Sequence, residues 1–244
     1  MNHFWTHKDK IPQGYGYGQF TLAHFLWIAL TFAGTLLVVI LYGNANHADR
    51  LIVLRTIAAT LILIDAIKMF VIAITGIKVL DYLPLEVCSF AAYFIVCDSI
   101  WPGNSVLPQM LLTLFLPAAI MAILFPTTTT LPSFNFFTIH QFLYHGLLMA
   151  YIFARFFASE IPLTSAGVWR SIFIMCPLVA FMYLFDVKFD KNYMFLRDTY
   201  GNAMLETIRN KSENNIGYQA GLVCFSIMSV HVFYLFFKLL EILL

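Results

Sequence analysis

The chain has 244 residues, of which 61% are hydrophobic and 11% are charged, and its formal net charge is +1. A soluble domain does not reach this composition, and a near-neutral chain without a basic patch gives no support to nucleic-acid binding. A bilayer core about 30 Å thick is crossed by about 20 apolar residues in a helix. We therefore predict an all-α, multi-pass integral membrane protein, located in the cell membrane if the source is bacterial.

Hydrophobic stretches separated by turn-forming runs define the predicted organisation. Residues 1–18 form a polar and aromatic N-terminal segment, and residues 19–244 form a single transmembrane helical domain. Runs rich in Gly, Pro, Asn and Thr separate the spans. Six spans are the alternative if the first lies apart or one segment is re-entrant. The seven predicted spans are residues 20–42, 51–78, 82–101, 106–124, 136–157, 167–184 and 218–244.

A polar connection at about residues 185–217 precedes the last span and includes a candidate amphipathic helix near residues 203–210. With seven spans, this connection and the N-terminus lie on one side of the membrane. The positive-inside rule then places that side in the cytoplasm. The third and fifth spans also start from this side, so their first turns are expected at similar depth.

Ionisable side chains within the spans are candidate functional groups, because each is costly in lipid. Asp65 and Lys68 are three residues apart and are expected to pair with each other. His140 and His145 are five residues apart, so they point about 140° apart on a helix and are poor joint ligands for a metal. We predict no metal and no cofactor.

Cys88 follows Leu83-Pro84-Leu85 at the start of the third span. A lone free cysteine is usually a small buried hydrophobe. Pro84, however, suits the first turn of a helix, which places Cys88 about one turn further, where the helix dipole stabilises a thiolate. Cys88 is about six residues into its span and His145 about nine, a depth difference of about 5 Å. His145 is therefore a candidate base for Cys88.

Three short motifs occur in order along the chain. They are Leu83-Pro84-Leu85 with Cys88 three positions on, Phe142 to Leu147 around His145, and Asn192-Tyr193-Met194-Phe195-Leu196. From about Leu83 to its end the chain resembles the bacterial YwaF and vertebrate transmembrane protein 164 family. It has Glu86 where many members have histidine, and Asn215 to Tyr218 where they have an aromatic-proline-aromatic cluster.

This resemblance implies a membrane-embedded acyltransferase that moves an acyl chain from a glycerophospholipid to a lysophospholipid, with Cys88 as nucleophile and His145 as its partner. Membrane phospholipids and lysophospholipids are the implied partners. Such chemistry needs hydrogen-bond donors for the oxyanion, and Ser89, Asn192 and Tyr193 are the candidates. If water replaces the acceptor lipid, the same dyad is a lipid hydrolase.

A small-molecule transporter or ligand-binding membrane protein is the alternative from a different class. Its polar residues would bind substrate or relay protons. No inverted repeat is apparent, which weakens the transporter alternative. The sequence leaves the oligomeric state open. In all these interpretations the candidate substrate-binding residues within or near the spans are Asp65, Lys68, Glu86 and His140.

Overall fold

The structure is a computed structural model that describes residues 3–200 and 202–243. It is 73% helical, and the described residues contain no strand, which confirms the all-α prediction. Short 3-10 turns occur at Lys8–Lys10, Val79–Asp81 and Tyr193–Phe195. The helices are α1 (Leu22–Asn44), α2 (His47–Ile74), α3 (Val87–Ile100), α4 (Leu107–Met110), a π-helical turn (Leu111–Phe115), α5 (Leu116–Leu124), α6 (Phe136–Phe157), α7 (Ser165–Phe189), α8 (Ala203–Asn210) and α9 (Asn215–Leu243).

Six helical segments are long and apolar enough to cross a membrane: α1, α2, the continuous segment from α4 to α5, α6, α7 and α9. This confirms a multi-pass membrane protein. The predicted third span differs, because α3 has only 14 residues. At 1.5 Å per residue α3 is about 21 Å long, shorter than the bilayer core. The predicted seven spans therefore become six full-length crossings and one short apolar helix.

The late start of α3 has a local cause in Pro84. Proline disfavours helical geometry at the preceding residue and lacks an N–H, so the run from Leu83 to Leu85 stays outside the helix. It forms a tight turn in which the Leu85 N–H donates to the Leu83 carbonyl at 2.7 Å. The N–H of Leu83 instead donates to the Tyr193 hydroxyl, at 3.2 Å. The prediction that Pro84 lies in the first helical turn is therefore wrong. The helix begins at Val87, and Cys88 is its second residue.

Helix α6 forms the centre of the bundle and contacts α1, α2, α3 and α5. Its close approach to α1 depends on Gly146, where an added Cβ would lie 3.0 Å from the Thr31 methyl group. The Thr35 hydroxyl donates to the Gly146 carbonyl at 3.4 Å. Small residues and threonine hydroxyls are typical of helix pairs that pack closely in membranes.

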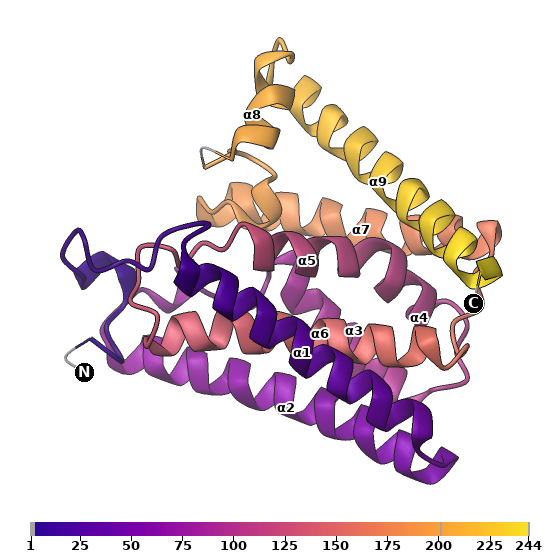
Figure 1. The fold of residues 1–244 in the computed structure, drawn as a ribbon. Coiled ribbons are helices and arrows are strands. Elements are labelled where there is room, and N and C mark those ends of the chain that lie inside the picture. Colours follow the sequence, from indigo (N-terminus) through magenta and orange to yellow (C-terminus); the bar gives the residue numbers. More distant parts are fainter. Residues whose placement is uncertain (1–2, 201, 244) are drawn as a thin grey trace.

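Figure 1 shows the chain entering at one end of the bundle and α9 ending at the opposite end. We call the first of these ends the N-terminal face: α1, α3 and α6 begin there, and α2, α5 and α7 end there. The N-terminal segment packs across it, with the Asn135 side chain donating to the carbonyls of His3 (2.7 Å) and Thr6 (2.9 Å). The Tyr17 N–H donates to the Leu131 carbonyl at 2.9 Å.

Helices α7 and α9 pack on one side of this bundle and diverge toward α8, which joins them through the polar connection (Figure 1). Val168 and Ile172 of α7 pack with Val230 of α9. Helix α7 extends to Phe189 and α9 begins at Asn215, so the connection is shorter than predicted. The helix expected within it is present as α8.

Candidate functional site

Cys88 lies at the N-terminus of α3 with a half-buried free thiol. The first N–H groups of a helix have no acceptor within the helix. Here the Glu86 carbonyl accepts from the N–H groups of Ser89 (2.9 Å) and Phe90 (3.1 Å). The N–H groups of Val87 and Cys88 donate to no acceptor among the described residues. These two backbone N–H groups at the start of α3 are therefore available as hydrogen-bond donors near the thiol.

His145 is buried near the middle of α6. Its Nδ1 lies 2.7 Å from the Gln141 carbonyl oxygen of the same helix. A carbonyl can only accept, so Nδ1 carries the proton, and Nε2 of the neutral ring keeps its lone pair. No donor within the described part of the chain reaches Nε2. The ring is thus held in the tautomer that a general base requires.

Tyr144 joins these two helices. Its hydroxyl donates to the Cys88 carbonyl at 3.4 Å, and its ring contacts the His145 ring edge-on with centroids 5.6 Å apart. The first turn of α3 therefore lies against α6 at residues 144 and 145. In the described structure no hydrogen bond joins the Cys88 thiol to the His145 ring. Sequence reasoning missed Tyr144, whose only signal was its position beside His145 and four residues after His140.

A second polar cluster contacts Tyr144 through the His140 ring. Lys68 forms an ion pair with Asp65, as expected from their spacing on one helix face. The Nε2 atom of His140 is 3.7 Å from the Asp65 carboxylate, and the His140 ring stacks on Tyr144 with centroids 5.3 Å apart. These three predicted residues are therefore grouped with one another, and Tyr144 links them to the Cys88 turn.

The remaining candidates hold the connection after α7 against the start of α3. The Glu86 carboxylate accepts from the Met194 N–H at 2.9 Å, and the Tyr193 hydroxyl donates to the Leu80 carbonyl at 2.5 Å. Burial raises the pKa of Tyr193 to about 12, which keeps this hydroxyl protonated. Met194 lies in the left-handed region (φ 57°), so Glu86 holds a strained segment in place.

The Asn192 side chain forms its hydrogen bonds within the same connection. Its side-chain oxygen accepts from the N–H groups of Arg197 (2.8 Å) and Asp198 (3.0 Å), and its amide donates to the Asp198 carbonyl at 2.8 Å. The Asn192 amide is thus bonded within the connection, whereas the Tyr193 hydroxyl is bonded to Leu80 in the 3-10 turn between α2 and α3. Ser89 is buried in the first turn of α3, next to Cys88.

No group of three or more His, Cys, Asp or Glu side chains suited to a metal ion occurs among residues 3–200 and 202–243. The four cysteines of the described chain are free: Cys88 and Cys97 are half-buried, whereas Cys176 and Cys224 are exposed on the outer helices.

Comparison with known proteins confirms the resemblance that the motifs indicated. The family model of the TMEM164 family matches residues 19–238. The match includes α1 and α2, which precede all three motifs. No curated protein and no solved structure matches the chain. Together with the six long apolar helices, the family match supports an integral membrane protein that crosses the bilayer several times.

Proposed function

Because this chain belongs to the TMEM164 family of membrane proteins, we propose that it is a membrane-embedded acyltransferase acting on glycerophospholipids. Cys88 takes an acyl chain from a donor phospholipid and passes it to a lysophospholipid. One observation carries the proposal: a free thiol at a helix N-terminus lies in the turn that contacts α6 beside His145, together with two N–H groups that have no acceptor among the described residues.

In the first half-reaction, Nε2 of His145 removes the thiol proton of Cys88. The sulfur attacks the ester carbonyl carbon of the donor lipid, and the N–H groups of Val87 and Cys88 stabilise the oxyanion. The bond between the carbonyl carbon and the glycerol oxygen then breaks. The leaving oxygen takes the proton from His145, which releases a lysophospholipid and leaves a thioester on Cys88.

The second half-reaction reverses these steps with a different lipid. His145 removes the proton from the hydroxyl of the acceptor lysophospholipid, whose oxygen attacks the thioester carbonyl. The carbon–sulfur bond breaks, and Cys88 recovers its proton from His145. Bonds and protons balance over the two halves without a cofactor.

The surroundings of Cys88 favour transfer over hydrolysis. Its side chain packs with partly buried apolar residues such as Val87 and Phe90 against the main core, so access of water is restricted. The transporter alternative has less support, because Asp65 and Lys68 are paired with each other. A lipid acceptor, by contrast, can bring its hydroxyl to the thioester from the bilayer.

The test is acyl exchange by the purified full chain in lipid nanodiscs that contain a phospholipid with an isotope-labelled acyl chain and an unlabelled lysophospholipid. Mass spectrometry follows labelled product, and intact-protein mass detects a hydroxylamine-sensitive acyl group on Cys88. We expect Cys88→Ala and His145→Ala each to lower transfer by about 10³-fold or more.

Cys97→Ala is the matched control, since Cys97 is the other half-buried cysteine of α3. It should keep full transfer and remain acylated at Cys88. Full transfer by Cys88→Ala, or an equal loss in Cys97→Ala, would end the proposal. Size-exclusion profiles of each variant show whether a loss of transfer reflects a loss of fold.

A further inference from the structure

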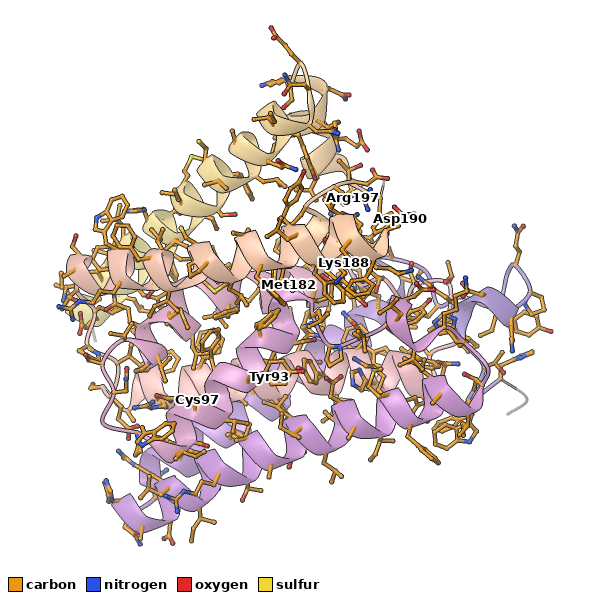
Figure 2. All side chains as sticks on the ribbon, turned by 180° about the vertical axis from the view of Figure 1, so that it is seen from behind. Tyr93, Cys97, Met182, Lys188, Asp190 and Arg197 are labelled. Atoms are coloured by element: carbon orange, nitrogen blue, oxygen red, sulfur yellow. The ribbon has the colours of Figure 1, made fainter. Side chains whose placement is uncertain are left out.

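A polar pocket of about 330 Å³ opens on the N-terminal face, between the end of α7, the connection at residues 190–200 and the start of α9. Its lining includes the polar side chains of Tyr183, Arg197, Asp198 and Asn215. Figure 2 shows Arg197 beside Asp190 at the end of α7. This volume is at the lower end of the range for small-molecule sites, so it suits a headgroup rather than a whole lipid.

Arg197 is anchored through one nitrogen. Its Nη1 donates to the carbonyls of Asp186 (2.9 Å) and Lys191 (2.9 Å) and to the Asp190 carboxylate (3.0 Å). Its Nε and Nη2 donate to no described acceptor. These two nitrogens form one edge of the guanidinium, whose parallel N–H groups match two oxygens of a phosphate. The anchoring leaves this edge available to a ligand.

Asp198 supplies the opposite charge in the same pocket. Its Oδ1 accepts from the Thr199 N–H at 2.6 Å, whereas Oδ2 accepts from no donor in the described structure. The lining carries two cations, Lys191 and Arg197, and two anions, Asp190 and Asp198. A neutral lining with a free cationic edge and a free carboxylate oxygen complements a zwitterion better than an anion.

Two uncharged side chains add donors to this arrangement. The Asn215 side-chain oxygen is occupied by the Arg209 guanidinium at 2.7 Å, which leaves its amide N–H groups for a ligand. The Tyr183 hydroxyl has no partner in the described structure. Phosphate oxygens accept from such groups.

The pocket is tied to the first turn of α3. Tyr193 and Met194, which follow the pocket residue Asn192, bond the backbone at Leu83 and the Glu86 carboxylate. They also pack with Val87, the residue before Cys88. A headgroup in the pocket therefore lies on the same face of the bundle as the Cys88 turn.

We propose that this pocket binds the zwitterionic headgroup of the lysophospholipid acceptor, a phosphate diester that carries a cationic amine. The free edge of Arg197 binds the phosphate, with Tyr183 and Asn215 as further donors, and the Asp198 carboxylate binds the cationic nitrogen. The identity of the ligand as an acceptor lipid rests on the acyltransferase function proposed above. A soluble phosphorylated amino alcohol offers the same polar groups, so the test separates these two sources.

The test measures equilibrium binding to the full chain carrying Cys88→Ala, which retains the pocket but lacks the thiol. Three probes are compared: lysophosphatidylcholine, the anionic lysophosphatidylglycerol, and soluble glycerophosphocholine, a phosphate diester with the same zwitterionic headgroup. We expect the zwitterionic lysolipid to bind at least tenfold more tightly than either other probe. Adding Asp198→Asn, which keeps an oxygen for the Thr199 N–H, should remove the preference over the anionic lysolipid.

Tyr183→Phe should weaken both lysolipids by about threefold or more without changing the preference, because it removes only a phosphate donor. Lys188→Gln is a control for a change of charge outside the pocket, since Lys188 lies near the end of α7 (Figure 2) but does not line the pocket. It should change nothing. Unchanged binding and preference in both Asp198→Asn and Tyr183→Phe would overturn the pocket assignment.

Binding of glycerophosphocholine as tight as that of lysophosphatidylcholine would overturn the lipid source, because the lipid tail would then contribute nothing. Binding with the expected pattern but without acyl transfer by the unsubstituted chain would support the pocket and overturn the acyltransferase function. The two proposals therefore fail in different measurements.

Discussion

Two arginines at opposite ends of the bundle use their guanidinium groups differently. Arg155 is 3% exposed, and each of its three nitrogens has a partner: Asp98, Glu160 at 3.3 Å and the Pro102 carbonyl at 3.1 Å. Arg197 is half-exposed and makes all three of its contacts through one nitrogen. In the described structure, every nitrogen of the Arg155 guanidinium is hydrogen-bonded to the protein, whereas Nε and Nη2 of Arg197 are left for a ligand.

The same contrast holds for the groups around each arginine. Near Arg155, the hydroxyls of Tyr151 and Tyr42 donate to Asp98 and Glu160, both at 2.6 Å. Around Cys88, the Nε2 atom of His145 and the N–H of Cys88 remain without partners in the described chain. The Arg155 guanidinium is therefore fully paired, although the buried Oδ1 of Asp98 accepts from no donor among the described residues. Paired buried groups contribute to stability and a unique packing, whereas unpaired donors and acceptors beside a free thiol can meet a substrate.

Replacing Arg155 with Met should cause the largest loss of stability, because Asp98 would stay buried without its counter-charge. We expect the free energy of unfolding to fall by about 3–5 kcal/mol. Arg197→Met, at a half-exposed site, should cost about 1 kcal/mol. Thermal unfolding in detergent micelles measures both. Equal losses of stability in the two variants would contradict this difference between the two arginines. Partial recovery of stability in the double variant Arg155→Met with Asp98→Leu would show that the loss comes from the unpaired Asp98 charge.

Removing the Tyr144 hydroxyl should affect activity more than stability. Tyr144→Phe removes the contact with the Cys88 carbonyl, so we expect kcat for acyl transfer to fall about tenfold. The free energy of unfolding should change by about 1 kcal/mol or less. Tyr151→Phe is the control at the other end, and it should lose stability while keeping kcat. A loss of stability alone in Tyr144→Phe would leave that tyrosine a purely structural residue.

The smallest effect is expected at His7, in the N-terminal segment. Burial lowers its pKa below the usual 6.5, even with Asp9 adjacent. The unfolded segment therefore binds a proton at a higher pH than the packed one, so the contribution of His7 is present at pH 7.5 and is lost as pH falls below 6.5. When the pH is lowered from 7.5 to 5.5, the protection of residues 3–20 against hydrogen exchange should fall a few-fold, after correction for the pH dependence of intrinsic exchange. His7→Gln should remove this fall in protection, and an unchanged fall would assign it to another group.

Local features of the chain were predictable. The long apolar stretches predicted the crossing helices, the spacing of Asp65 and Lys68 predicted their pairing, and the pattern at residues 203–210 predicted α8. Each depends on residues within one or two helical turns of one another. Such short-range relations follow from helix periodicity and from the cost of polar groups in lipid.

Contacts between distant segments were not predictable. The sequence makes Glu86 a candidate substrate-binding residue, yet its carboxylate accepts from the Met194 N–H, more than 100 residues along the chain. Asp98 could not be matched with Arg155 rather than with another basic residue. Pro84 was predicted to lie in the first turn of α3, although the connection after α7 supplies a hydrogen-bond partner for Leu83 outside that helix. A one-dimensional pattern does not specify which loop packs against which helix end.

By itself, the sequence determined that this chain is a multi-pass helical membrane protein, with a thiol at the start of its third apolar stretch and an imidazole within its fifth, because hydropathy, period and motif order are local properties. Only the tertiary structure decided that Cys88 is the second residue of a short helix, that Tyr144 joins its turn to α6, and that Arg197 keeps one edge free. These outcomes depend on which backbone groups the packing leaves unpaired, and the packing is a property of the whole fold.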